Sequence, residues 1–338
     1  MASISSLLNE FHRSKADRYI KKWTPIACDH FRSGFNASGF VRLFFALPDR
    51  PSSFWGIDRC LRIWEHTGSH SSHVFHQGVF AQSIDLQKNF KIPWEDSRFH
   101  DLQTQTLNQF FSLLEFLSID DKRLQVSYCG GCVLGGHPDG RDRLLKKKYR
   151  FPEDRVSRKF LRQRGIRCVG VPALDSIAMN GPEGTPVGVG LEVFCDDVEI
   201  GTILFHCFKI RNGILQPINY LAIYGVGLER LASVINGGNF LESVERYARA
   251  REILAREVEA ARLSIFDRDV RRLLYGLEAL AVIPSRISMT QRRLMQPVKL
   301  EVKRLILDLG LTFQDVKAVF SFFQHWKDQR AHSTTAAR

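Results

Sequence analysis

The spacing of hydrophobic and polar residues divides the chain into a strand-rich part and a helical part. Hydrophobic residues recur at helical spacing over 1–23 and over 99–118, which predicts an amphipathic helix in each segment. Over 40–85, short hydrophobic runs alternate with Pro, Gly and Ser clusters, which is typical of strands joined by turns. Further strand-like runs follow at 123–130, 190–197 and 200–208.

From residue 241 onward the helical spacing continues almost without strands, and Pro284 and Pro297 are expected to interrupt the helices. A boundary near Gly237 and Gly238 is natural. The pattern predicts an α+β domain, an α-helical domain and a frayed tail, over 1–240, 241–330 and 331–338.

Composition favours an ordered protein, with 44% hydrophobic and 25% charged residues. The sequence has no run of about eighteen apolar residues, which is the length that would predict a membrane span. Glu10, His12 and Arg13 interrupt any hydrophobic core of a signal peptide. The seven cysteines, an odd number in a long chain, suit a reducing compartment, so we expect a cytoplasmic protein.

The net charge of +12 comes mainly from two regions of the chain. Residues 141–167 hold twelve Lys and Arg against three Asp and Glu, and the helical end is also basic. Such a surface suits a polyanionic partner such as RNA, a nucleotide or an acidic carrier. A solvated helix face or loop explains the same charges equally well.

The segment "YGVGLERL" at 224–231 carries the strongest sign of chemistry. It predicts a strand that runs into a helix, with Gly225 and Gly227 at the junction, where glycine lets a ligand approach the backbone. Arg230 then falls on the first helical turn, where a guanidinium suits a phosphate oxygen. The alternatives are glycines that only shape a turn and an arginine that forms a salt bridge.

This segment resembles motif 3 of class II aminoacyl-tRNA synthetases, most closely that of alanyl-tRNA synthetases. Three upstream segments are similar to other parts of that family in the same order. They are 58–65, which places Arg62 on the arginine of motif 2, then 71–83 and 188–209. Residues 268–304 weakly resemble the helical domain that contacts the tRNA acceptor stem.

The resemblance implies an antiparallel class II synthetase-like sheet flanked by helices, which binds ATP and Mg²⁺ and activates a carboxylate as its adenylate. It places Arg62 on the α-phosphate and Arg230 on the γ-phosphate. Gly225 and Gly227 would let the backbone approach the nucleotide. Such chemistry depends mainly on positioning and electrostatics.

The resemblance also assigns residues around the adenine, the metal and the substrate. Phe75 takes the position of the family's aromatic residue beside adenine, and Gln77 that of a glutamate near the same base. Glu199 takes the position of a carboxylate that binds Mg²⁺ in related enzymes. Ile223 stands where the family has the aspartate that binds the amino group of alanine. Thr202, preceded by Gly201, replaces a tryptophan-asparagine pair and implies a roomier, differently polar substrate site.

These features predict an ATP-dependent ligase that activates an amino acid or related carboxylic acid. It would transfer the acyl group to tRNA, a carrier protein or a small amine. The loss of the aspartate suggests a specialised role outside general translation. The alternative is an inactive synthetase paralogue that binds RNA or protein.

Two further clusters raise the alternative of a metal site. Four histidines fall within eleven residues, at His66, His70, His73 and His76. Strand alternation would divide them between two faces, so zinc is the less favoured interpretation. Cys129 and Cys132 form a C-x-x-C pair with His137 nearby, for which a buried or turn pair is simpler than a redox or zinc site.

Overall fold

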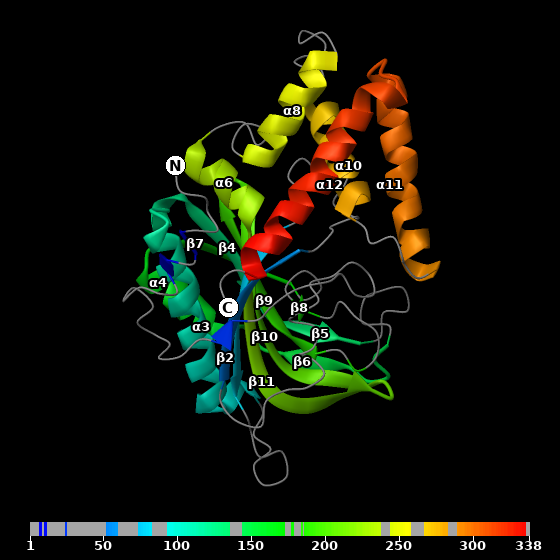
Figure 1. Cartoon of the computed structure of the whole chain (residues 1–338). Coiled ribbons are helices and arrows are strands. Elements are labelled where there is room, and N and C mark those ends of the chain that lie inside the picture. Colours follow the sequence, from blue (N-terminus) through cyan, green and yellow to red (C-terminus); the bar gives the residue numbers. More distant parts are fainter. Residues whose placement is uncertain are drawn as a thin grey trace. The chain divides into compact units, whose positions relative to one another are not determined.

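The structure is a computed structural model that divides into two compact units (Figure 1). The first holds the sheet and ends at Leu231, and the second holds the helices that follow Ala232. The structure describes residues 7–8, 10–11, 24–25, 52–59, 74–82, 93–135, 144–172, 177–178, 184, 186–237, 244–257, 267–282 and 289–335.

Among the described residues, nine strands form one sheet in the order β1, β2, β3, β11, β10, β9, β4, β7, with β8 paired to β9. Strands β5 and β6 form a separate pair. The strands are β1 Thr24–Pro25, β2 Ser52–Arg59, β3 Val74–Gln82, β4 Leu124–Cys129, β5 Cys132–Leu134, β6 Tyr149–Phe151, β7 Arg167–Val171, β8 Ile177–Ala178, β9 Pro186–Cys195, β10 Val198–Arg211 and β11 Ile214–Gly227.

The centre of the sheet is antiparallel, as predicted, but its two edges are not. Across the centre, each strand pairs antiparallel with its neighbour in the order β3, β11, β10, β9, β4. At the edges β4 pairs parallel with β7, and β1 pairs parallel with β2. The fold is therefore α+β with a mixed sheet, and the expectation of a wholly antiparallel sheet was wrong at its edges.

Helix α3 (Ser97–Phe116) packs on one face of this sheet through aromatic side chains. Phe99 lies against Tyr220 with ring centroids 4.9 Å apart, and Phe110 lies against Tyr224 at 5.6 Å. Asp96 caps the helix and also accepts a 2.9 Å hydrogen bond from the Tyr220 hydroxyl. The cap and the aromatic contacts together fix α3 against β11, and helix α4 (Arg155–Gln163) lies beside it through the Phe111–Phe160 contact.

A β-bulge in β10 decides which side chains share the other face of the sheet. Glu199 pairs with Phe194, but Gly201 pairs with Val193, so Ile200 is an extra residue in β10. Directly paired residues of antiparallel strands point to the same face. The bulge therefore places Glu199 and Thr202 on one face, although strict alternation over three residues would separate them.

His206 of β10 is buried, with 4% of its surface exposed, and burial lowers its pKa to about 4. A folded-state pKa below the unfolded value of 6.5 gives stability that is complete above that value and lost as the pH falls towards 4. The shift corresponds to about 3 kcal/mol at about 1.4 kcal/mol per unit.

We expect the His206→Gln variant to lack this acid dependence. Urea denaturation of both proteins from about pH 7 to about pH 4 measures it, because the difference between their curves cancels the other titrating groups. The free energy of unfolding of the wild type should fall by about 3 kcal/mol more than that of the variant. Parallel curves would show that His206 is not a buried neutral imidazole.

The second unit is helical. Its helices are α8 Glu245–Glu257, α10 Asp267–Val282, α11 Met289–Asp308 and α12 Phe313–Thr335, and α6 Leu228–Asn236 joins β11 to it. A buried ion pair of 2.9 Å joins Arg246 of α8 to Glu278 of α10, and Tyr247 donates a hydrogen bond to the same carboxylate. Pro297 lies inside α11, so the prediction that it interrupts a helix was wrong.

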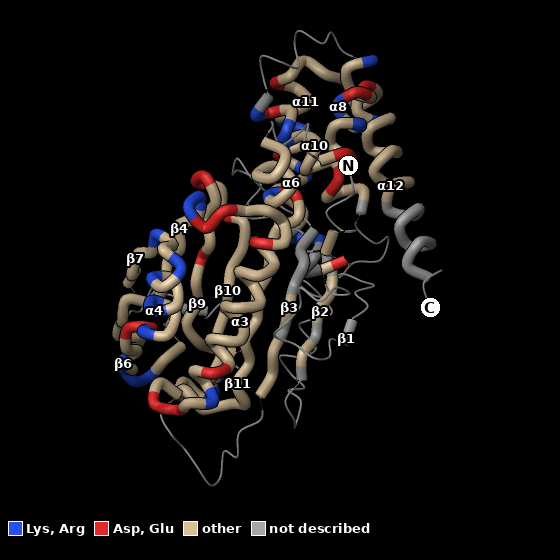
Figure 2. The backbone as a smooth tube through the Cα atoms, turned by 90° about the vertical axis from the view of Figure 1, so that its left-hand side faces the viewer, with Lys and Arg blue, Asp and Glu red and all other residues tan. Residues whose placement is uncertain are grey.

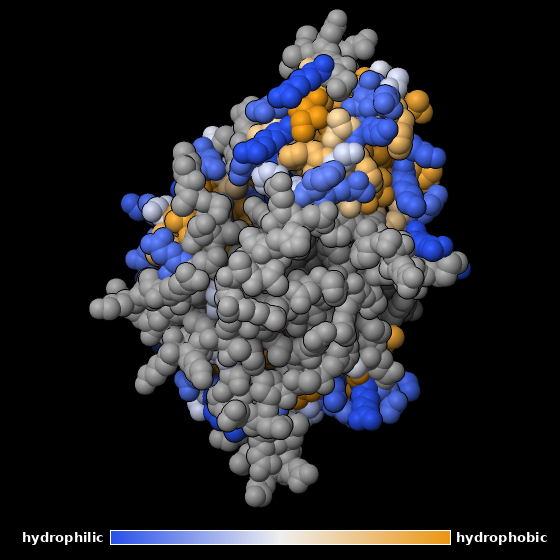
Figure 3. Space-filling view, viewed as in Figure 1, coloured by the Kyte–Doolittle hydropathy of each residue, from blue (hydrophilic) through white to orange (hydrophobic). Residues whose placement is uncertain are grey.

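The surface of this unit mixes polar and apolar side chains. Leu300, Leu307 and Phe313 are exposed at 58%, 75% and 76%. On the face that Figure 3 shows, hydrophobic side chains lie among hydrophilic ones. None of the helices in the described part of the chain is long and apolar enough to cross a membrane.

Candidate functional site

The site begins where strand β11 runs into helix α6. β11 ends at Gly227 and α6 starts at Leu228, as the sequence predicts. Arg230 on the first turn of α6 reaches back to the start of β10. Its Nη1 lies 3.0 Å from Oε2 of Glu199 and donates a 3.1 Å hydrogen bond to the backbone carbonyl of Glu199.

This ion pair is the salt bridge that the sequence analysis gave as the alternative for Arg230, and it joins the two residues that the resemblance assigned to phosphate and to metal. The Arg230 side chain is 6% exposed and that of Glu199 is 30% exposed. A guanidinium offers five N–H donors in a fixed plane, and the contacts to Glu199 fix the orientation of that plane. The pair combines a buried, oriented cation with a carboxylate that solvent still reaches.

Next to the pair, five residues of five adjacent strands lie in one straight cross-strand row. They are Gln77, Gly225, Thr202, Glu192 and Ser127 of β3, β11, β10, β9 and β4. Gly225, Thr202, Glu192 and Ser127 are all partly exposed. The cross-strand row is therefore a strip of small and polar residues on the face of the sheet opposite α3.

The predicted substrate residues occupy different rows. Thr202 lies in the cross-strand row, whereas Ile223 pairs with Leu204 in the next row and is buried. Gly201 lies on the α3 side, where a Cβ atom would stand 3.3 Å from the Phe110 ring and 2.5 Å from the carbonyl oxygen of Gly225. Its small size thus serves packing, and the expectation that it widens the substrate site was wrong.

Glu192 is a residue of the cross-strand row that the sequence analysis did not name. It pairs directly with Thr202 on one side and with Ser127 on the other, and its backbone N–H donates a 3.3 Å hydrogen bond to Oγ of Ser127. The available signal was a single acidic residue within the hydrophobic run at 190–195. Only the register of β9 shows that this carboxylate belongs to the cross-strand row.

The remaining predicted site residues come from the segment around β2 and β3. Phe75 pairs with Gly227 and Gln77 pairs with Gly225, so the backbone of β3 brings both positions beside the two glycines. Arg62 lies outside the described residues. The assignments of Arg62, Phe75 and Gln77 therefore stay predictions.

Comparison with known proteins gives little support to any family. No protein-family model matches the chain, and no curated protein is similar to it. Among solved structures, it is similar to PylSc, a pyrrolysyl tRNA synthetase of Desulfitobacterium hafniense, at 12% identity and a TM-score of 0.27. The match covers 60% of this chain and 48% of that chain. At this identity and TM-score it carries no argument about function.

The alternative metal sites find no support in the described residues. No group of three or more His, Cys, Asp or Glu side chains among them is arranged to hold a metal ion. A hydrogen bond with Cys129, together with burial, raises the pKa of the Cys132 thiol, which disfavours the thiolate that metals and redox chemistry need. His66, His70, His73 and His137 lie outside the described residues.

The basic stretch of the sequence forms a surface on the first unit. Figure 2 shows Lys and Arg gathered around α4, β6 and β7. Of the basic residues within α4, β6 and β7 themselves, five are exposed and form no ion pair within the described part of the chain, and we name them the α4 basic surface: Arg150, Arg155, Lys159, Arg162 and Arg167. By contrast, Arg158 pairs with Glu153, and Arg164 with Asp121.

Proposed function

We propose that the chain activates an amino acid or related carboxylic acid as an acyl-adenylate at the expense of ATP, and transfers the acyl group to an acceptor. The observation that carries the proposal is the Arg230–Glu199 pair at the junction of β11 and α6, beside the cross-strand row. An oriented guanidinium and a solvent-accessible carboxylate on one sheet face suit a triphosphate and its cation.

In this proposal Arg230 holds the γ-phosphate, and the backbone at Gly225 and Gly227 lies along the nucleotide. A carboxylate oxygen of the acid attacks the α-phosphorus, a P–O bond forms, and the bond to pyrophosphate breaks. The guanidinium draws off the charge that develops on the leaving group. Arg62 is proposed to act on the α-phosphate.

Glu199 is the residue proposed to hold Mg²⁺. A single carboxylate fits this ion, because Mg²⁺ is usually bound through one or two carboxylates together with the phosphates of the substrate. When bound there, the ion would offset negative charge on the phosphates. The 30% exposure of Glu199 leaves its carboxylate accessible to such a ligand.

The test is ATP–pyrophosphate exchange with a panel of amino acids and simple carboxylic acids, without any acceptor. Exchange that depends on one of these acids is the expected result and identifies the acid. ATP binding without exchange for any acid, alone or with tRNA added, would reject adenylation. Absence of both binding and exchange would favour the inactive paralogue.

The α4 basic surface supports a polyanionic acceptor, for which we use single-stranded RNA as the probe. We expect the triple variant Arg155→Gln, Lys159→Gln, Arg162→Gln to bind a labelled RNA more weakly in fluorescence anisotropy. The slope of log K against log salt should fall by about 2, at about 0.7 per phosphate contact.

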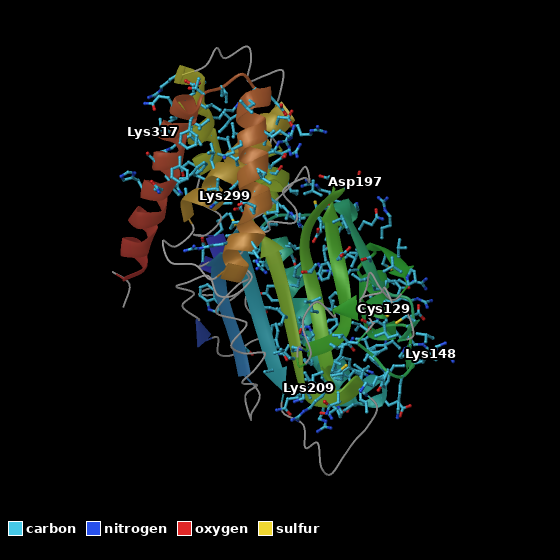
Figure 4. All side chains as sticks on the ribbon, turned by 90° about the vertical axis from the view of Figure 1, so that its right-hand side faces the viewer. Cys129, Lys148, Asp197, Lys209, Lys299 and Lys317 are labelled. Carbon is cyan, nitrogen blue, oxygen red and sulfur yellow. The ribbon has the colours of Figure 1, made fainter. Side chains whose placement is uncertain are left out.

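A matched triple variant on the helical unit compares the two basic regions at equal net charge. Lys299, Lys303 and Lys317 are exposed residues of α11 and α12, and Figure 4 labels two of them. Their change to Gln removes the same three charges from the helical end, which the sequence also makes a candidate for a polyanion. A slope that falls by about 2 in the α4 variant and by less than about 0.7, the value of one contact, in the helical variant would assign the RNA contacts to α4. A wild-type slope in the α4 variant would show that no RNA site lies there.

A further inference from the structure

Strand β7 lies at one edge of the sheet, and part of its backbone points away from the sheet. It pairs with β4 on one side, and within the described part of the chain no strand pairs with its other side. The N–H of Gly130 donates a 2.9 Å hydrogen bond to the carbonyl of Val171, so the backbone of Val171 faces β4. Because this direction alternates along a strand, Val169 also faces β4, whereas Cys168 and Gly170 direct their N–H and C=O groups outwards. These are the groups with which a further strand would pair.

The two faces of this edge differ in character. Directly paired residues share a face, and such pairs connect Cys168, through one residue each of β4 and β9, to Gly201 on the α3 side of the sheet. Helix α4 lies beside α3 on that side. Val169 alternates with Cys168 and therefore lies on the opposite face, where its side chain is 45% exposed. A strand added at β7 would meet α4 with one set of side chains and an apolar residue with the other.

The charge around β7 selects the kind of strand. Helix α4 contains four Lys and Arg and no acidic residue, and Arg167 of β7 belongs to the same basic surface. Figure 2 shows how these charges surround the edge. A second copy of the chain that paired through its own β7 would bring two basic surfaces together, and the like charges would repel. An acidic strand is attracted by the same charges.

We propose that β7 binds an extended acidic segment of a partner protein as an additional strand of the sheet. The outward backbone groups of Cys168 and Gly170 would form its hydrogen bonds. Its acidic side chains would meet α4, and apolar ones would meet Val169, so the segment that fits alternates acidic and apolar residues. The inference goes beyond the proposed function, because it concerns the edge of the sheet and not the Arg230–Glu199 pair or the acid.

The probe is a labelled peptide in which Glu and Val alternate over about seven residues, an ordinary strand length. Its binding to the whole chain is measured by fluorescence anisotropy. Two further peptides carry N-methyl groups, one on every Glu and the other on every Val. Only alternate N–H groups of an added strand face β7, so one set of methyl groups should weaken binding by about tenfold or more and the other by less than about threefold.

The sensitive set also gives the direction of the strand. In an antiparallel pair, the peptide residues that exchange hydrogen bonds with Cys168 and Gly170 lie directly opposite them and share the α4 side. Those residues are Glu in the proposed arrangement, so a loss with the Glu set indicates an antiparallel strand. In a parallel pair the hydrogen bonds go to the flanking residues, and a loss with the Val set indicates that arrangement.

Two variants at one position test the same groups in the protein. Cys168→Pro removes an outward N–H, and proline is tolerated on an edge strand where its nitrogen faces solvent. Cys168→Ala removes the thiol but keeps the N–H. We expect the Pro variant to bind the peptide about tenfold more weakly and the Ala variant to bind it like the wild type. Thermal unfolding shows whether each variant is folded, and the methylated peptides test the wild type in any case.

Several results would contradict strand addition. They are an absence of peptide binding to the wild type, or equal effects of the two sets of methyl groups. Binding that is lost in the α4 triple variant but unchanged in Cys168→Pro would show that charge alone holds the peptide. The labelled RNA has no strand backbone, so the Pro and Ala variants should bind it equally. RNA binding without peptide binding would assign this surface to nucleic acid and reject the protein segment.

Discussion

Replacing Arg230 with alanine is expected to lower the rate of ATP–pyrophosphate exchange by about 1000-fold or more. The guanidinium is 6% exposed, held by two contacts to Glu199, and placed on the first turn of α6. Such an oriented cation requires little rearrangement when charge develops on the leaving pyrophosphate. The measurement is kcat/KM for the acid that supports exchange.

The loss should be specific to activity and not to folding. Glu199 is partly exposed, so water can solvate its carboxylate in the variant, and we expect the free energy of unfolding to fall by only about 1–2 kcal/mol. Arg164→Ala is a matched control, because it breaks another arginine–carboxylate pair of the same unit, 2.8 Å from Asp121. Wild-type exchange in the Arg230→Ala variant would reject the assignment of the phosphate site.

The elements that sequence patterns predict well are those with a strong local signal. The helix expected at 99–118 is α3 at Ser97–Phe116, which begins two residues earlier because Asp96 accepts the hydrogen bond of its N-cap. The hydrophobic runs at 123–130, 190–197 and 200–208 overlap β4, β9 and β10. In each case, hydrophobic periodicity and burial agree.

Strands without such a signal were missed. β7 (Arg167–Val171) begins at the last residue of the basic stretch, and no strand was predicted there. It is an edge strand that pairs parallel with β4, and its residues are largely exposed. Its existence depends on a partner strand about forty residues earlier, and no local pattern of hydrophobic residues indicates that pairing.

The site shows the same division between local and long-range information. The strand-to-helix junction around Gly225, Gly227 and Arg230 was predicted because the change in the hydrophobic pattern is local. The pairing of Arg230 with Glu199 and the sharing of one face by Glu199 and Thr202 depend on the bulge at Ile200. Alternation alone would have placed Glu199 on the opposite face, and it gives no register for Glu192.

Whether a glycine within a strand is sterically required can also be seen only from the structure. The sequence "PVGVGLEV" suggests nothing more than a flexible strand, yet Gly188 of β9 is sterically required. It pairs with His206 of β10, and a Cβ atom there would stand 1.7 Å from the carbonyl oxygen of Phe205 and 2.7 Å from Cα of His206. These are backbone atoms in the centre of the sheet, and they cannot rotate away as a side chain can.

We therefore expect Gly188→Ala to separate β9 from β10 and to lower the free energy of unfolding by about 3 kcal/mol or more. Gly165→Ala is the control, because Gly165 has φ +71° but no atom within 4 Å of the added Cβ. Backbone strain alone should cost that variant about 1–2 kcal/mol. Urea denaturation of both measures the difference.

Similar losses in the two variants would contradict the close approach of the strands. A larger loss at Gly188 would support the β9–β10 register, on which the position of Glu192 opposite Thr202 depends.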